Sequence, residues 1–232
     1  MEAVFFDFDG TLTTHESDTK VHRNIFRKAR DRLNIEWDEE DIINKVKKYE
    51  VLTSEYFYEY SGERYVPSRF LSSRGFEDIL RDEGVNYRKE DVEWFQNLHI
   101  DQHVKHSVLR EGAIEVLENI KDDKKYLGII TNSDSELSLP RIEKLGIKDY
   151  MDFIITADQA GYYKPHPKPF ELSLDKIDIP SNECMYVGDN PETDSGSQGL
   201  GMNFTLVNTK DKVDVNGADY VIKDLRELLD VI

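Results

Sequence analysis

The sequence predicts an α/β protein with a doubly wound, mostly parallel sheet and an inserted all-helical domain. Residues 1–12 and 108–232 alternate short apolar runs with helical patterns, which is typical of βαβ units. Residues 14–107 are instead rich in charged and aromatic side chains and show helical periodicity. We therefore expect a core formed by 1–13 and 108–232 and a helical insertion formed by 14–107.

The first predicted element is a strand in the run Val-Phe-Phe-Asp-Phe-Asp-Gly-Thr-Leu at positions 4–12. Apolar, β-favouring residues in such a run indicate a buried strand. Side chains at positions i and i+2 of a strand share a side, so Asp7 and Asp9 should leave the strand end in similar directions. Two neighbouring buried carboxylates are costly unless a cation compensates them. Gly10 supplies the positive φ that a sharp exit requires.

The remaining elements of the core follow from the same alternation of patterns. Right-handed crossovers would wind these strands into one sheet. We expect strands at 126–131, 153–156, 184–187, 204–207 and 220–222, and helices at 111–121, 136–145, 167–176, 193–200 and 223–229.

Polar side chains follow several of these predicted strands, at the edge where the carboxyl ends of parallel strands converge. Carboxylates, a hydroxyl and a lysine at one edge suit a phosphate group and a hard cation such as Mg²⁺. The residues concerned are Asp7 and Asp9, Thr131 and Asn132, Lys164, and Asp189 and Asp194.

Four motifs stand in a fixed order: Asp-Phe-Asp-Gly-Thr, Thr-Asn, Lys-Pro-x-Pro-x-x-Phe and Gly-Asp-x-x-x-x-Asp. These motifs span Asp7 to Asp194. In their identity and order, the chain resembles the haloacid dehalogenase-like (HAD) hydrolases of the helical-cap (C1) phosphatase type. The resemblance implies a Rossmann-like core with a cap domain inserted after the first motif. It also implies an enzyme, a hydrolase of phosphoric monoesters.

The resemblance assigns a role to each matching residue. Asp7 would be the nucleophile that forms an aspartyl-phosphate, and Asp9 the general acid and base. The Asp7 side chain, the Asp9 backbone carbonyl and Asp189 would hold Mg²⁺. Asp194 would bind a metal-held water or orient Lys164.

Further residues are expected to bind the substrate. Thr131 would donate to a phosphoryl oxygen, Lys164 would neutralise the developing charge, and Asn132 and Gly10 would lie beside the phosphate. In the insertion, Arg69 and Arg74 are candidates for gripping an anionic substrate, although they could equally be ordinary surface arginines.

The predicted function is Mg²⁺-dependent hydrolysis of a small phosphate monoester through an aspartyl-phosphate. Asp9 favours this reading, because haloacid dehalogenases typically lack the second aspartate and phosphonatases typically carry a small residue there. Alternatives that stay open are a dehalogenase or phosphonatase-like hydrolase, a sugar-phosphate mutase, and a non-catalytic receiver-like phosphoacceptor.

Composition limits the partners. A net charge of -17 and a pI near 4.8 argue against binding to nucleic acid or to anionic membranes. No apolar run approaches the roughly 20 residues of a membrane span. Cys184 is the single cysteine, which excludes an intrachain disulfide and suits a reducing cytoplasm. We expect a cytoplasmic monomer or homodimer whose partner is a small phosphorylated metabolite.

Three histidines, His99, His103 and His106, share one helical face by their spacing. A solvated helix face is the favoured interpretation, and a transition-metal site is the alternative.

Overall fold

The structure, a computed structural model, describes residues 1–207 and 217–232 and divides the chain into two compact units. The first, which we call the sheet unit, comprises Met1–Thr14, Ser61–Tyr65 and Val108–Ile232. The second, the helical unit, comprises His15–Tyr60 and Val66–Ser107.

The sheet unit is built on six strands that all run parallel, in the order β3-β2-β1-β4-β5-β6. The strands are β1 Ala3–Phe6, β2 Tyr126–Ile130, β3 Phe153–Ile155, β4 Cys184–Gly188, β5 Asn203–Val207 and β6 Tyr220–Ile222. The predicted fold class is therefore confirmed, with β1 at the centre of the sheet as the apolar character of its sequence requires.

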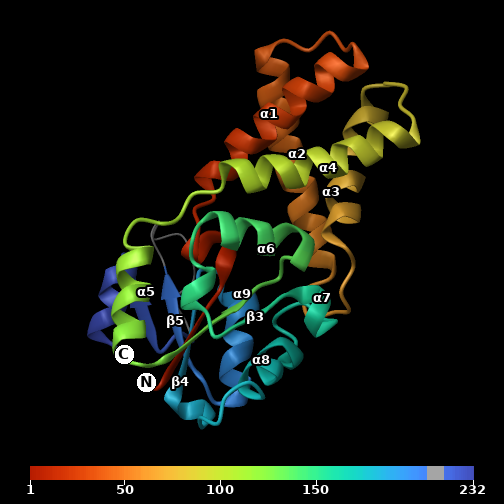
Figure 1. Ribbon diagram of the computed structural model, residues 1–232. Helices are drawn as coiled ribbons and strands as arrows, with labels where there is room; N and C mark the ends of the chain where they lie inside the picture. The colour runs from red at the N-terminus through yellow and green to blue at the C-terminus, as the bar shows by residue number, and fades with distance from the viewer. Residues whose placement is uncertain (208–216) are drawn as a thin grey trace. The chain divides into compact units, whose positions relative to one another are not determined.

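The two faces of the sheet bury alternate side chains of each strand. In β1, Val4 and Phe6 pack on one face with α5 (Ala113–Asp122) and η5 (Leu225–Asp230), while Phe5 packs on the other face with α8 (Pro167–Leu174). Figure 1 shows α5 and α8 on opposite sides of the strands. Each fully buried phenylalanine contributes about 1.5–3 kcal/mol of hydrophobic free energy, so this alternation fixes which face each strand residue takes.

Two of the helices expected in the core are short 3₁₀ turns instead. The predicted helix at 193–200 is split into α9 (Pro191–Asp194) and η4 (Ser195–Leu200), and the one at 223–229 is η5. Serine and glycine dominate η4, and both have weaker helix propensity than alanine or leucine. The other short elements are η1 Phe8–Leu12, α6 Ser135–Lys144, η2 Lys148–Tyr150, α7 Ala157–Ala160 and η3 Ser181–Glu183.

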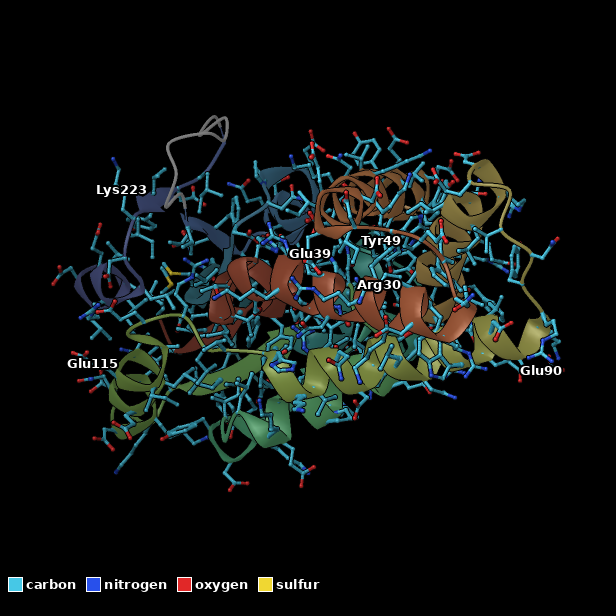
Figure 2. The ribbon with its side chains drawn as sticks, turned by 90° about the horizontal axis from the view of Figure 1, so that it is seen from above. Arg30, Glu39, Tyr49, Glu90, Glu115 and Lys223 are labelled. Atoms are coloured by element: carbon cyan, nitrogen blue, oxygen red, sulfur yellow. The ribbon has the colours of Figure 1, made fainter. Side chains whose placement is uncertain are left out.

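The helical unit contains four helices, α1 Glu16–Leu33, α2 Glu39–Glu59, α3 Ser68–Asp82 and α4 Lys89–His106. Asp38 and Asp41 form a reciprocal capping box that begins α2. Tyr49 is buried among the helices, whereas the partly buried Arg30 pairs with the exposed Glu39 at 3.8 Å (Figure 2). Among the described residues, no helix is long and apolar enough to cross a membrane.

One short part of the 14–107 segment belongs to the sheet unit, which corrects the expectation that all of it is helical insertion. Ser61–Tyr65 runs antiparallel to residues 161–164, and three backbone hydrogen bonds of 2.9–3.3 Å join the two segments. The Tyr65 hydroxyl also donates to the Asp134 carboxylate at 3.0 Å. Backbone pairing with a distant segment is the physical reason for the difference.

Candidate active site

Three polar residues follow three neighbouring strands at one edge of the sheet. The Asp7 amide donates to the Val187 carbonyl at 2.8 Å, so Asp7 continues β1 alongside β4. The Thr131 amide donates to the Ile155 carbonyl at 3.0 Å and directly follows β2. Asp189 directly follows β4. The carboxyl ends of the strands thus bring these residues to a common edge, as the parallel topology requires.

Lys164 joins several polar side chains at this edge. Its Nζ donates three hydrogen bonds, to Asp7 Oδ1 at 2.9 Å, to Asp194 Oδ1 at 2.7 Å and to the Tyr186 hydroxyl at 2.7 Å. Burial alone would lower the pKa of Lys164, but the two carboxylates raise it above its usual value. Asn132 positions its backbone, accepting from the Lys164 amide at 2.6 Å and donating to its carbonyl at 3.3 Å. Lys164 is therefore a fixed, charged ammonium.

Three carboxylates gather around this lysine. Asp7, Asp189 and Asp194 each offer an oxygen, and these oxygens lie within 4.8 Å of one another. We call these three residues the acidic cluster. Burial, with added repulsion from Asp194 and Asp189, raises the pKa of Asp7 to about 8 although Lys164 opposes the shift. Burial also raises the pKa of Asp194. The carboxylates leave negative charge that Lys164 does not balance, and oxygen donors of this kind fit Mg²⁺.

Asp194 owes its position to the glycine that ends β4. A Cβ at Gly188 would collide with the Asp194 carboxylate, so a residue without a side chain is needed for this close approach. The Asn190 amide donates to Asp194 Oδ2 at 3.1 Å, while Oδ1 accepts from Lys164. The carboxylate is fully buried, and both of its oxygens are hydrogen-bonded.

Asp9 has a different partner from Asp7. Its Oδ1 accepts from Arg141 Nη2 at 2.6 Å, and its side chain is 33% exposed. Arg141, on α6, is almost fully buried and also lies 4.8 Å over the ring of Phe8. The sequence led us to expect Asp7 and Asp9 to point in similar directions. Both residues have extended backbone angles beyond the end of β1 at Phe6, but their carboxylates have different partners, Lys164 for Asp7 and Arg141 for Asp9.

The turn after β1 is closed by backbone contacts. Gly10 has φ of 85°, as predicted, and the Thr13 amide reaches back to the Phe8 carbonyl at 3.0 Å. Arg110 donates to the carbonyls of Gly10 and Thr11, the latter at 2.7 Å. These bonds hold the turn that carries Asp9.

Thr131 is buried at the same edge. Its Oγ1 accepts from the Ser133 amide at 3.1 Å, which leaves the hydroxyl hydrogen able to donate elsewhere. The Asn132 side chain, by contrast, is bonded to the backbone of Lys164. A binding role for Asn132 toward a phosphate is left to its backbone amide or to the second hydrogen of its side-chain nitrogen.

Sequence comparison now settles the family. The model of the haloacid dehalogenase-like hydrolases matches residues 1–197. The chain belongs to this family of enzymes. The resemblance inferred from the four motifs is thereby confirmed.

Two relatives of known name align over almost the whole chain. Ribulose-1,5-bisphosphate 5-phosphatase of Halopiger xanaduensis is 24% identical over 241 residues, covering 99% of this chain and 98% of that protein. Glyceraldehyde 3-phosphate phosphatase of Methanocaldococcus jannaschii is 27% identical over 242 residues, covering 100% and 97%. Among solved structures, YfnB of Bacillus subtilis, a magnesium-bound structure assigned to the HAD hydrolases, shares the fold with a TM-score of 0.82. That pair has 18% identity, with 99% and 97% of the two chains covered.

The two arginines expected to contact substrate lie on α3 of the helical unit. The Arg74 guanidinium pairs with Glu59 at 3.2 Å and lies 3.8 Å over the Tyr56 ring. The Arg69 carbonyl accepts from the Ser72 hydroxyl at 3.2 Å. A role for either arginine in binding substrate stays a prediction.

Sequence reasoning missed three residues that organise the HAD site. Tyr186 donates to the Ile130 carbonyl at 2.8 Å and accepts from Lys164, and a tyrosine inside a buried strand signals such a need for partners. Arg141 precedes Ile142 on the predicted helix 136–145, and a buried arginine signals an ion pair. Arg110 carried no signal in the sequence, because its acceptors are backbone carbonyls distant along the chain.

Proposed function

We propose that the protein is a Mg²⁺-dependent phosphatase that hydrolyses a small phosphate monoester through an aspartyl-phosphate on Asp7. The observation that carries the proposal is the contact of Lys164 with Asp7 and Asp194, next to Asp189. A nucleophilic carboxylate, a fixed cation and a group of hard oxygen ligands then occupy one strand edge. The names of the two relatives, both phosphatases of phosphorylated sugars, support the substrate class.

The reaction divides into two displacements at phosphorus. In the first, an Asp7 oxygen forms a bond to phosphorus while the ester P–O bond breaks and the leaving oxygen takes the proton of Asp9. In the second, water attacks the phosphorus of the aspartyl-phosphate and gives its proton to Asp9. The bond to Asp7 then breaks and inorganic phosphate is released. Asp7 and Asp9 return to their starting states.

Charge neutralisation is the main task of the surrounding residues. Lys164 stabilises the negative charge of the phosphoryl group and Thr131 offers a hydroxyl hydrogen to one of its oxygens. Asp7, Asp189 and the Asp9 carbonyl would hold Mg²⁺, with Asp194 behind them. The ion, when bound, would polarise the phosphoryl oxygens and favour the ionised form of Asp7, which burial otherwise disfavours.

We further propose that the helical unit serves as the cap that selects the leaving group. This proposal is supported by the position of the insertion in the sequence, directly after the motif that carries Asp7 and Asp9. Arg69 and Arg74 are the candidates in it for an anionic substrate.

Phosphate release tests the proposal. We would assay three proteins with and without Mg²⁺: the wild type, Asp7→Asn and the control Asp149→Asn, which changes an exposed position. The substrates are p-nitrophenyl phosphate and a panel of sugar phosphates, phosphoglycolate and nucleotides. We expect Mg²⁺-dependent release that Asp7→Asn lowers by at least about 1,000-fold, because the nucleophile is lost. The control should match the wild type.

Three outcomes would overturn the proposal. If Asp7→Asn released phosphate at the wild-type rate, Asp7 would not be the nucleophile. Hydrolysis of a halogenated acid or phosphonate that needs neither Mg²⁺ nor Asp9 would favour the dehalogenase or phosphonatase reading. A phosphorylated Asp7 that is stable for hours would favour a phosphoacceptor.

A further inference from the structure

A second group of metal-type ligands lies inside the helical unit. His22 on α1 and His99 and His103 on α4 each offer a ring nitrogen, and these nitrogens lie within 4.8 Å of one another. We call these three residues the histidine cluster. The ring centroids of His99 and His103 are 4.4 Å apart, and that of His22 lies 5.9 Å from His99 and 5.3 Å from His103. The spacing of His99 and His103 puts both on one face of α4, and α1 supplies the third ring.

The sequence interpretation of these histidines was wrong in two respects. His103 is buried, so the face that it occupies is not a solvated one. His106, which the spacing grouped with it, is not part of the cluster, and His22 takes that place.

Two carboxylates lie behind the imidazoles. Glu50 on α2 contacts Nδ1 of His22 at 2.9 Å, and Asp18 on α1 contacts Nδ1 of His103 at 3.6 Å. A carboxylate on one ring nitrogen fixes the tautomer and makes the other nitrogen a better ligand, which is the usual environment of metal-binding histidines. Burial raises the pKa of Glu50, but the hydrogen bond with His22 and the charges nearby outweigh burial and lower it. Glu50 therefore carries negative charge.

Aromatic rings surround the histidine cluster. The Tyr49 ring lies 5.0 Å from His22 and 6.4 Å from His99, and the Phe95 ring lies 5.9 Å from His99. These aromatic contacts help to fix the orientations of the imidazole rings. The neutral imidazole is the form that binds metals.

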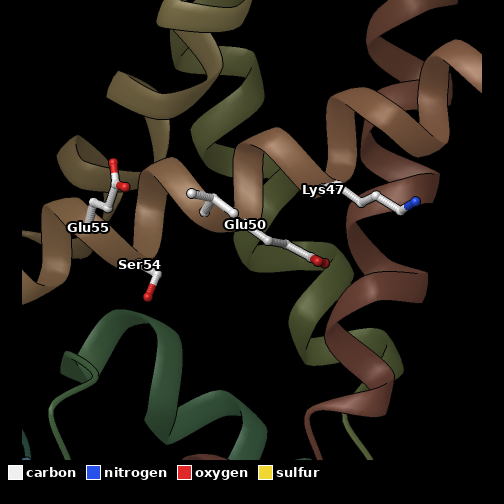
Figure 3. A pocket seen from close by; sticks show the side chains of 5 residues that line it. Lys47, Glu50, Ser54 and Glu55 are labelled. Carbon is white, nitrogen blue, oxygen red and sulfur yellow. The ribbon is translucent and has the colours of Figure 1, made fainter.

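Glu50 connects this interior to the surface. Together with Lys47, Val51, Ser54 and Glu55 it lines an open hollow of about 500 Å³ on α2, and its side chain extends away from the helix axis (Figure 3). An ion entering at the hollow would meet the Glu50 carboxylate first and His22 next.

We propose that His22, His99 and His103 bind one divalent transition-metal ion, Zn²⁺ as the reference case, and that this ion links α1 to α4. Imidazole nitrogens suit Zn²⁺ rather than Mg²⁺. Bonds of about 2.0–2.1 Å in tetrahedral geometry place ligand nitrogens about 3.3 Å apart, which small side-chain rotations can reach from the observed spacing. The charges of Asp18 and Glu50 offset that of the ion. This site is independent of the phosphatase proposal.

The test uses the full chain stripped of metal with EDTA and then given millimolar Mg²⁺ to saturate the acidic cluster. Zn²⁺ binding is measured by titration calorimetry, and Co²⁺ is used as a spectroscopic probe whose visible absorption reports nitrogen coordination. The variants are His103→Gln and His99→Gln, with His106→Gln on the same helix as the control. We expect one Zn²⁺ per chain, a rise in the unfolding temperature on binding, and at least about 100-fold weaker binding in both cluster variants. The control should bind like the wild type.

The proposal fails if the wild type binds no Zn²⁺ at micromolar concentration, since the cluster is then aromatic packing. It also fails if both cluster variants bind as tightly as the wild type, since the ion then lies elsewhere. Circular dichroism separates lost binding from lost folding. His99, which is less buried than His103, provides the decisive variant if His103→Gln unfolds. Because these readouts do not involve catalysis, a failure here is distinct from a failure of the phosphatase proposal.

Discussion

The acidic cluster of the sheet unit and the histidine cluster of the helical unit hold charge in opposite ways. In the acidic cluster the candidate ligands are carboxyl groups that can carry charge themselves, and Lys164 contacts two of them. In the histidine cluster the candidate ligands are imidazole rings, and the carboxylates of Glu50 and Asp18 lie behind them. If each binds an ion as proposed, the first arrangement offers the oxygen donors that suit a hard cation and the second the imidazole nitrogens that suit a transition metal.

The two clusters are also positioned by different backbone structures. Asp7 is held at the end of a central strand by a hydrogen bond to the neighbouring strand. His99 and His103 depend on the turn of a single helix, to which α1 adds His22. A strand end fixes its residues through the whole sheet, so we expect the acidic cluster to tolerate fewer substitutions.

The largest effect should come from removing the cation of the acidic cluster. Lys164→Met leaves buried carboxylates without their partner. We expect phosphatase activity to fall by at least about 1,000-fold and the free energy of unfolding to fall by about 3–5 kcal/mol. Activity assays and urea denaturation measure both, and the surface variant Lys168→Met serves as control. Zn²⁺ binding to the histidine cluster should persist in the folded variant. Wild-type activity in Lys164→Met would contradict the role given to this lysine.

A smaller effect is expected from the partner of Asp9. Arg141→Met removes the 2.6 Å contact that orients the carboxylate, so kcat should fall by about 10- to 100-fold with little change in KM. Arg141→Lys, which keeps the charge but loses the planar fork, should recover part of the loss. Steady-state kinetics across a pH series provide the measurement. An unchanged kcat and pH profile in Arg141→Met would mean that Arg141 only supports packing.

A third effect is expected in stability rather than in activity, when no metal is bound. The pKa of Asp7 is 3.8 in the unfolded chain, and burial raises it to about 8 in the folded chain. Between these values the folded state binds the extra proton, so the contribution of Asp7 to the free energy of unfolding falls as pH rises. In EDTA, Asp7→Asn should therefore gain stability relative to the wild type from pH 4 to 8, and the difference should then level off.

Chemical denaturation at several pH values measures that difference. Adding Mg²⁺ at pH 8 should stabilise the wild type and reduce the gap, because the ion favours the ionised carboxylate. A constant difference between wild type and Asp7→Asn at all pH values would show that burial does not shift the Asp7 pKa.

Much of the sheet could be predicted because local patterns carry the information. Apolar runs bounded by turn residues identify β2 to β6 to within about two residues, and the parallel topology then brings their carboxyl ends together. Ser61–Tyr65 could not be assigned in this way. Its place depends on backbone hydrogen bonds to residues 161–164, and backbone pairing leaves no periodic signature in side chains.

The candidate site was predictable to a similar extent. Motif order identified Asp7, Lys164 and Asp189; Asp7 and Asp189 directly follow strands, whereas Lys164 lies in the loop between α7 and α8. The pairing of Asp9 with Arg141 could not be predicted, because it joins residues 132 positions apart in the sequence. The pairing of His22 with α4 depends on how two helices pack, which spacing along one helix does not specify.

The short pairing of Ser61–Tyr65 with residues 161–164 bears on how the protein can be taken apart. The chain passes between the two units four times, at 14/15, 60/61, 65/66 and 107/108. The helical unit therefore cannot be removed as one continuous segment without also removing part of the sheet unit. Deleting 15–107 in one piece would also strip three backbone hydrogen bonds from the segment that leads into Lys164. A shortened protein that contains only the sheet unit would therefore have to keep Ser61–Tyr65. The same holds for a chimera that carries the insertion of a relative.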